Sequence, residues 1–154
     1  MNNLDPLNIP LKGLNLIEAS AGTGKTYAIS NIYLQLLVEG NFNVEEILVV
    51  TFTKAATEEL KGRIRGRIMD ALHALSGNNE VDDFLKGFTA NISNREVARR
   101  KLINALRSFD LAAIFTIHGF CLRMLHNHAF ESASLFDTGL VEDQTEVLAE
   151  IVDD

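Results

Sequence analysis

The stretch "ASAGTGKT", residues 19–26, constrains this chain more than any other part of its sequence. It fits the phosphate-loop pattern G-x-x-x-x-G-K-[ST], with alanine at the position of the first glycine. Gly22 and Gly24 leave the backbone room to turn its N–H groups inward around a phosphate. Lys25 can reach the β- and γ-phosphates, and the Thr26 hydroxyl can bind Mg²⁺. These residues predict a site for ATP with Mg²⁺.

The predicted nucleotide-binding residues are the whole loop and the start of the helix after it. Lys25 and Thr26 carry the chemistry, and Thr26 is the predicted Mg²⁺ ligand through the nucleotide. A chance glycine-rich turn is the alternative, but turn chemistry alone does not require Lys-Thr after Gly24. The full set is Ala19, Ser20, Ala21, Gly22, Thr23, Gly24, Lys25 and Thr26.

The segments around this loop predict a parallel sheet flanked by helices. Leu14–Glu18 has the apolar residues of a short strand, and helical spacing follows from 24 to 39, where Gly40 is expected to end the helix. The continuously apolar run 47–50 predicts a second strand, covered on both faces. Strand, helix and strand in this order form a βαβ unit, which indicates an α/β fold with a parallel sheet.

Further along, apolar spacing predicts two more helices before the third strand. The first runs from Lys54 to about 76–79, and we interpret its basic run at 61–67 as a solvated face. The second opens at a capping box, "SNRE" at 93–96. Its predicted apolar face consists of Val97, Leu102, Ile103, Leu106 and Phe109. Residues 111–118 predict the third strand, a helix is expected from 119 to about 130, and helical spacing returns after 141.

Length and charge limit the function classes. At 154 residues the chain has the size of one ordinary domain. Its formal net charge of −7 excludes a surface that is basic all over, so any contact with nucleic acid must be local. No signal peptide or apolar run long enough to span a bilayer is visible, and the single Cys121 cannot form an internal disulfide. A cytoplasmic protein without a membrane contact is therefore expected.

Two further groups of polar and aromatic residues follow predicted strands. Thr51, Phe52, Thr53 and Lys54 come after the second strand, and His118 and Phe120 come after the third. Because parallel strands end at one edge of a sheet, these side chains could share a surface with the phosphate loop. Hydroxyls and a lysine contact phosphates, and exposed rings stack on bases. Each phenylalanine taken alone is more typical of a core residue than of an exposed one.

Three motifs in this order, "ASAGTGKT", "VTFTKAATEEL" and "FTIHGFC", resemble the UvrD/Rep type of superfamily 1 DNA helicases. Within that type, "LIEASAGTGKT" and "IFTIHGFCLRMLHNHAFES" are similar to helicase and exonuclease subunits that work in a heterotrimer. The resemblance implies a P-loop NTPase fold of the RecA-like type. It also implies ATP-driven translocation on single-stranded DNA, in double-strand break repair and recombination.

The resemblance also implies a domain division and roles for the motifs. Residues 1–120 would be part of the first motor domain, with a helical insertion at 76–110, and residues 121–154 would begin a helical subdomain. In the family, the motif at 51–54 and the one at His118 and Gly119 line the DNA track. Single- and double-stranded DNA and two further subunits are the implied partners.

This chain departs from the family pattern in ways that affect activity. No glutamine that could read adenine precedes the loop, and no arginine-bearing later motif or nuclease motif is visible. Glu142 and Asp143 follow only two apolar residues, so we interpret them as a helix start and not as the Mg²⁺-binding acids. We therefore expect an N-terminal fragment with negligible hydrolysis of its own. A small P-loop kinase, for which Arg99 and Arg100 are weak lid candidates, and a non-enzymatic remnant are the alternatives.

Overall fold

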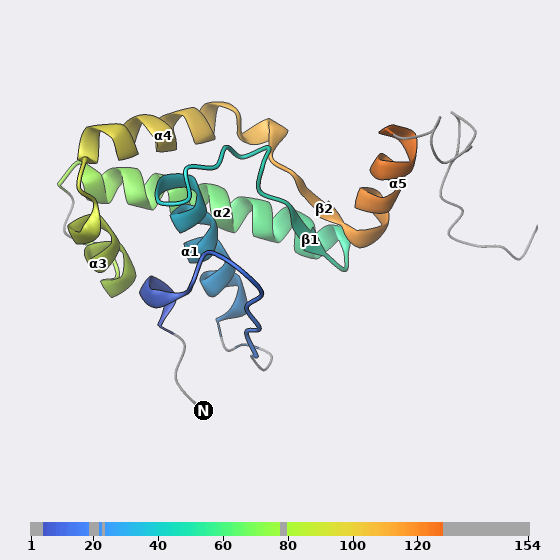
Figure 1. Ribbon diagram of the computed structural model, residues 1–154, viewed down its shortest axis with the longest axis horizontal. Coiled ribbons are helices and arrows are strands. Elements are labelled where there is room, and N and C mark those ends of the chain that lie inside the picture. The colour runs from blue at the N-terminus through green and yellow to red at the C-terminus, as the bar shows by residue number, and fades with distance from the viewer. Residues whose placement is uncertain (1–4, 19–21, 23, 78–79, 128–154) are drawn as a thin grey trace, which may run out of the picture. The chain divides into compact units, whose positions relative to one another are not determined.

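The structure is a computed structural model that describes residues 5–18, 22, 24–77 and 80–127. Contacts divide the chain into two units, Met1–Thr116 and Ile117–Asp154. Figure 1 shows the elements in chain order. They are η1 (Pro6–Asn8), α1 (Lys25–Val38), β1 (Val49–Thr51), α2 (Lys54–Leu75), α3 (Asp83–Asn91), α4 (Arg95–Arg107), η2 (Phe109–Leu111), β2 (Ile114–Thr116) and α5 (Ile117–Asn127).

The helix predicted after the phosphate loop is confirmed as α1. Its end differs in detail, because Asn41, with φ 60°, takes the left-handed conformation expected of Gly40. The Gly40 N–H still closes the helix by donating to the Gln35 carbonyl at 3.1 Å. Asparagine tolerates this conformation better than other residues with a side chain, so the stop signal lies one position later than the glycine indicates.

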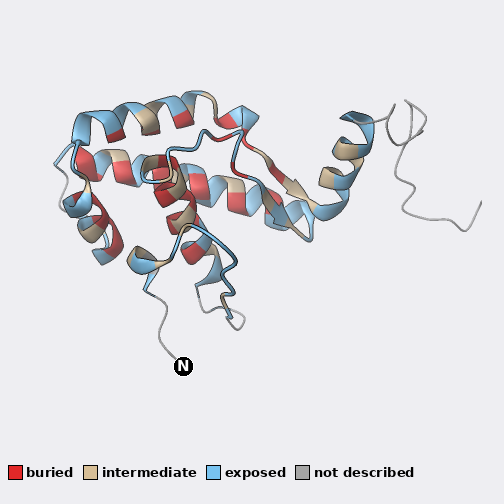
Figure 2. Cartoon of the chain, viewed as in Figure 1, coloured by how far each residue is buried: buried red, intermediate tan, exposed pale blue. Residues whose placement is uncertain are grey.

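The long helix α2 is confirmed, and it organises the core of the first unit. It packs against α1, α3 and α4. In Figure 1, α4 runs along α2 while α1 crosses it. The buried residues line the faces where these helices meet, as Figure 2 shows, and Ile64, Ile68 and Ala71 of α2 are fully buried. The predicted spacing of apolar residues therefore identified the packed face of α2 correctly.

The segment between α2 and β2 differs most from the sequence prediction. The specific helix α3 was not predicted, although Asp82 caps it and Phe84, Leu85 and Phe88 form its buried face. Asn94 caps α4 by accepting from the Val97 N–H at 3.1 Å, so the predicted capping box at 93–96 is wrong by one residue.

The packed face of α4 agrees with the predicted one only in part. Leu102 is buried and Leu106 packs against the core as predicted, whereas Val97 is 36% exposed and the buried Ala98 and Ala105 were not predicted. The small side chains of the buried alanines give only a weak apolar pattern in the sequence. Phe109, which was predicted for this face, is buried in η2 just beyond the helix.

The described sheet consists of β1 and β2, which pair in parallel, with Val49 opposite Ile114 and Thr51 opposite Thr116. This confirms a parallel pair, in strands shorter than predicted. The strand predicted at Leu14–Glu18 is wrong for this structure, because that segment has no ladder partner. Leu14 and Leu16 are 102% and 84% exposed, and the Asn15 side chain donates back to the Pro10 carbonyl at 2.8 Å. A strand requires a neighbour, and here none pairs with it.

The second unit is described only through α5, which confirms the helix predicted after the third strand. It begins at Ile117, two residues earlier than expected. The end predicted near residue 130, the helical spacing after 141 and the pair Glu142–Asp143 lie outside the described residues. The domain division at residue 120 stays a prediction. In the part of the chain that the structure describes, no helix has the length and apolar character needed to cross a membrane.

Candidate functional site

The described part of the phosphate loop requires glycine at two positions. Gly22 and Gly24 have φ angles of 78° and 87°, in the left-handed region that residues with a Cβ rarely adopt. Among the described residues, no atom outside the two chain neighbours lies within 4 Å of where a Cβ would stand at either glycine. The backbone conformation is therefore what makes a side chain unfavourable here. The other loop residues, Ala19, Ser20, Ala21 and Thr23, lie outside the described residues.

The start of α1 is open to a ligand. Gly24 occupies the N-cap without a side-chain hydrogen bond, and the first turn contains no acidic residue. Helix N–H groups at this end lack intrahelical acceptors, and the aligned peptide dipoles make the end electropositive. Lys25, the first residue of the helix, is exposed, and Thr26 is half-buried. This arrangement suits an anion such as a phosphate.

A second group of predicted residues lies where β1 runs into α2. Phe52 is 78% exposed, which contradicts its alternative interpretation as a core residue. Thr53 caps α2 by accepting from the Ala56 N–H at 3.1 Å. The Thr51 hydroxyl bonds to the Thr53 carbonyl at 3.2 Å and so belongs to the same turn. Lys54 is the exposed first residue of α2, and the first turn of this helix contains no acidic residue.

The third group lies on α5. His118 is exposed and Phe120 is half-buried. Both follow β2 directly in the chain, as Phe52 follows β1. α5 belongs to the second unit, so the shared surface predicted for these residues with Thr51–Lys54 stays a prediction.

A buried polar cluster beside the phosphate loop was not found by the sequence reasoning. Arg67 of α2 is 8% exposed, so it is the exception in the run 61–67, whose Arg63 and Arg65 are exposed as predicted for a solvated face. Its Nη1 and Nη2 bond to both carboxylate oxygens of Asp82 at 2.6 and 3.1 Å, and its Nε donates to Asn31 Oδ1 at 2.6 Å. Arg67 falls three residues after Ile64, on the apolar face of α2, and that placement was the available signal.

Asp82 is held ionised by this cluster. Partial burial alone would raise the pKa of Asp82. Hydrogen bonds from Arg67, the Leu85 N–H and the Tyr27 hydroxyl, together with the Arg67 charge, outweigh that effect and keep the pKa below its usual value. The carboxylate therefore stays charged at neutral pH and can serve Arg67 and the start of α3 at once.

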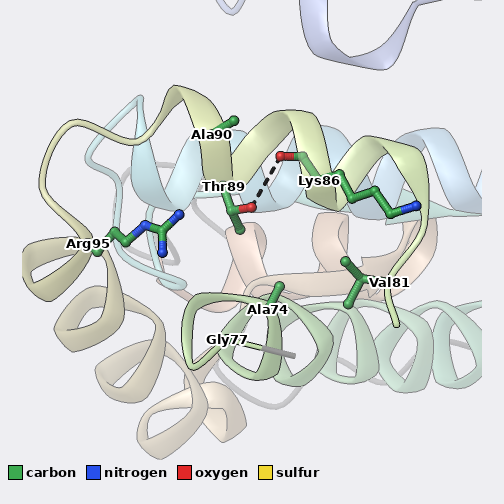
Figure 3. A pocket seen from close by; sticks show the side chains of 7 residues that line it. All are labelled: Ala74, Gly77, Val81, Lys86, Thr89, Ala90 and Arg95. Atoms are coloured by element: carbon green, nitrogen blue, oxygen red, sulfur yellow. Dashed lines mark hydrogen bonds between the residues drawn. The ribbon is translucent and has the colours of Figure 1, made fainter. Parts of the chain in front are cut away.

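A separate hollow of about 360 Å³ lies between the end of α2, α3 and the start of α4. Figure 3 shows Lys86 and Arg95 at its opposite ends, so the two cations do not converge on one point. Thr89 bonds within its own helix, to the Lys86 carbonyl at 3.2 Å. Lys86 pairs with Asp83 at 3.3 Å. Thr89 and Lys86 are thus engaged locally, and the start of α1 is the better candidate for an anion site.

Comparison with known proteins identifies the family of the chain. The chain matches the UvrD/REP helicase N-terminal domain over residues 3–154. It is 48% identical to the RecBCD enzyme subunit RecB of Haemophilus influenzae, over 94% of this chain and 13% of that protein. For RecB of Escherichia coli the identity is 47%, over 92% and 13%. For RecB of Mycobacterium tuberculosis it is 38%, over 95% and 14%.

These matches confirm the resemblance that the three motifs indicated. The chain spans about 13% of the length of the first two relatives.

Proposed function

Because this chain belongs to the UvrD/REP helicase family, we propose that it is the ATP-binding part of a DNA helicase subunit's first motor domain. The observation that carries the proposal is the start of α1. The helix has left-handed Gly24 as its N-cap, without a side-chain cap bond, and it begins with Lys25 and Thr26. In the complete protein, ATP hydrolysis would drive movement along single-stranded DNA.

The roles of the loop residues follow from their positions. Lys25 would neutralise the β- and γ-phosphates, and the Thr26 hydroxyl would bind the Mg²⁺ of the nucleotide. The N–H groups of residues 19–26 would surround the phosphates. Mg²⁺, when bound, supplies the charge that stabilises the departing phosphate oxygens. The acid and arginine groups that complete such a site would come from other parts of the protein.

We also propose the RecA-like P-loop fold for the complete domain. The parallel pairing of β1 and β2 supports it. Residues 1–120, with the insertion at 76–110, would then belong to the motor domain, and residues 121–154 would begin its helical subdomain.

The proposed DNA track begins at the turn between β1 and α2. Phe52 is exposed enough to stack on a base, and Lys54 is placed to contact a phosphate. The Thr53 hydroxyl uses a lone pair for its cap, so its proton remains the group that could bond to DNA. Thr51 would act chiefly by holding this turn. His118 and Phe120 would extend the track.

The names of the relatives suggest the assembly. By analogy with the RecBCD enzyme, RecC and RecD subunits would be partners in a heterotrimer that acts on DNA ends. Helicase and exonuclease activity in double-strand break repair and recombination, in the cytoplasm, would be properties of that assembly. We propose no hydrolysis by the 154-residue chain alone.

Calorimetry with the 154-residue chain tests this proposal. We expect weak binding of Mg-ATP and none of Mg-AMP, because AMP lacks the β- and γ-phosphates that Lys25 and the start of α1 would hold. ATP turnover should stay negligible when single-stranded DNA is added. Equal affinity for the two nucleotides would contradict the phosphate site, and fast DNA-stimulated turnover would contradict the inactivity of the chain alone.

A further inference from the structure

Arg67 is the most completely surrounded charged side chain among the described residues. Its guanidinium lies over two aromatic rings, 5.0 Å from the Tyr27 centroid and 5.1 Å from the Phe84 centroid. In its plane it bonds to Asn31 and to both oxygens of Asp82. Rings cover its faces and hydrogen-bond acceptors face its edges. Such a site uses the planar fork of arginine, which lysine cannot reproduce.

This guanidinium holds α1 at two successive turns. Nε donates to Asn31 at 2.6 Å in the second turn, and Nη2 lies 3.4 Å from the Tyr27 hydroxyl in the first. Tyr27 and Asn31 are four residues apart and lie on one face of the helix. Two contacts along one face limit both rotation of α1 about its axis and sliding along it.

The held turn is the one that carries the phosphate-binding residues. Lys25 and Thr26 are the first two residues of α1, and Tyr27 follows them directly. The N-cap residue Gly24 has no side chain with which to cap this helix end, so contacts such as those of Tyr27 help to fix its orientation. A small rotation of α1 would move Lys25, Thr26 and the exposed N–H groups together.

Asp82 connects the same cluster to α3. Its Oδ1 accepts from the Leu85 N–H at 2.9 Å as the cap of that helix, while both of its oxygens pair with Arg67. The Tyr27 hydroxyl also donates to its Oδ2 at 3.2 Å. The start of α3 and the start of α1 therefore share one carboxylate.

We propose that Arg67, held by Asp82, is a positioning residue that sets the orientation of the first turn of α1 for phosphate binding. This rests on the proposed function, since it needs Lys25 and Thr26 to bind a nucleotide. Arg67 touches no phosphate in this role. It acts through its contacts with Tyr27 and Asn31. Because Asp82 caps α3 and also pairs with Arg67, a change at the start of α3 would alter the orientation of the nucleotide-binding turn.

Three substitutions in the 154-residue chain separate positioning from simple stabilisation. Arg67→Lys keeps the charge and loses the fork, Asp82→Asn keeps a cap and loses the charge, and Tyr27→Phe keeps the ring and loses only the hydroxyl. Arg63→Lys is the matched control, because Arg63 lies on the same helix and pairs at 3.7 Å with Glu59 while both side chains are exposed.

The first measurement is the affinity for Mg-ADP by calorimetry, at a temperature where circular dichroism shows each variant folded. We expect Arg67→Lys to weaken binding about tenfold, as changes behind the contacting residues of a site typically do. Asp82→Asn and Tyr27→Phe should weaken it less, and Arg63→Lys should leave it unchanged. Unchanged affinity in Arg67→Lys with a lowered melting temperature would show an ion pair that only stabilises the fold.

The second measurement is amide hydrogen exchange of the chain without nucleotide. If Arg67 positions the first turn, exchange should accelerate at residues 28–31, whose N–H groups donate to the carbonyls of that turn, in Tyr27→Phe and Arg67→Lys, while α4 keeps its protection. Uniform acceleration across the chain, or none at 28–31, would overturn the proposal. If the wild-type chain binds no Mg-ADP, the proposed function fails, and the exchange comparison decides the positioning role by itself.

Discussion

The starts of α1 and α2 make an instructive comparison, because both helices begin with a lysine and have no acid in the first turn. A lysine at this end opposes the helix dipole, so neither start is optimal for stability. The α2 start is closed by a Thr53 cap at 3.1 Å, whereas the α1 start has left-handed Gly24 and no side-chain cap. We call the α1 start open because its N-cap residue makes no side-chain cap bond, and the α2 start closed because Thr53 caps it. Two similar sequences, "GKT" and "TKA", thus give one open and one closed helix end.

The difference shows what a phosphate loop requires beyond a positive charge. At α2, the cap satisfies one of the N–H groups that a phosphate would otherwise use. At α1, glycine supplies the backbone turn without a competing side chain, and the helix is held from the side by Arg67 instead. The lysines are similar, so the presence or absence of a side-chain cap is what distinguishes the two helix starts. Four experiments sharpen this comparison.

The largest effect is expected from exchanging the lysines for alanine. Lys25→Ala should abolish Mg-ATP binding with little loss of fold, because it removes the charge proposed to meet the β- and γ-phosphates. Lys54→Ala at the closed helix start should leave the affinity unchanged. Calorimetry measures both. Equal losses in the two variants would mean that the charge of the chain as a whole, and not the open end of α1, attracts the nucleotide.

Phe52 tests the surface next to the closed start. In a version extended to the length of the relatives, Phe52→Ala should weaken binding of oligothymidine by about 1 to 3 kcal/mol, the usual contribution of a stacked ring. Phe42→Ala is the matched control, since Phe42 is 44% exposed but lies before β1 and away from its carboxyl end. Fluorescence anisotropy gives the two affinities. The DNA role of Phe52 is excluded if both variants bind like the wild type.

Gly24 tests the open backbone itself. Gly24→Ala should destabilise the chain by about 1 to 2 kcal/mol, because φ 87° is strained for any residue with a Cβ. Gly62→Ala should have the opposite sign and stabilise by up to about 1 kcal/mol, since Gly62 lies within α2 with no atom close to an added Cβ. Urea unfolding followed by circular dichroism measures both. A stabilising Gly24→Ala would contradict the left-handed conformation.

The smallest effect concerns the cap of α2. Thr53→Ala should cost about 1 kcal/mol of stability, the typical value for loss of an N-cap hydroxyl. Thr53→Ser keeps the hydroxyl and should cost little. The nucleotide affinity should not change in either variant, because this cap belongs to the closed helix start. A Thr53→Ala chain as stable as wild type would show that the backbone alone holds the turn.

Sequence reasoning succeeded where the information is local. The spacing of Leu60, Ile64 and Ile68 fixed the buried face of α2, and the glycines before Lys25 fixed where α1 begins, because helix periodicity and caps depend on near neighbours. The parallel pair of strands was also correct in kind. Alanines on the packed face of α4 were missed because they give a weak apolar signal. The helix α3 was missed because it is short, although Phe84, Leu85 and Phe88 lie at helical spacing.

Reasoning from the sequence failed where a residue's surroundings come from distant parts of the chain. Arg67 was assigned to a solvated run, yet Asp82, fifteen positions later, and Asn31, thirty-six positions earlier, enclose it. Leu14–Glu18 has the composition of a strand but no partner in the described sheet. Composition cannot supply a ladder partner or a counter-ion, which only folding brings near.

The sequence by itself determined the family and the proposed phosphate site, because glycines, lysine and threonine act there through their positions along the chain. Only the tertiary structure decided that Arg67 is buried and touches the first turn of α1. It also decided that Phe52 faces solvent. Burial and pairing of a charge depend on helices packing across long sequence separations, and no local spacing encodes that packing.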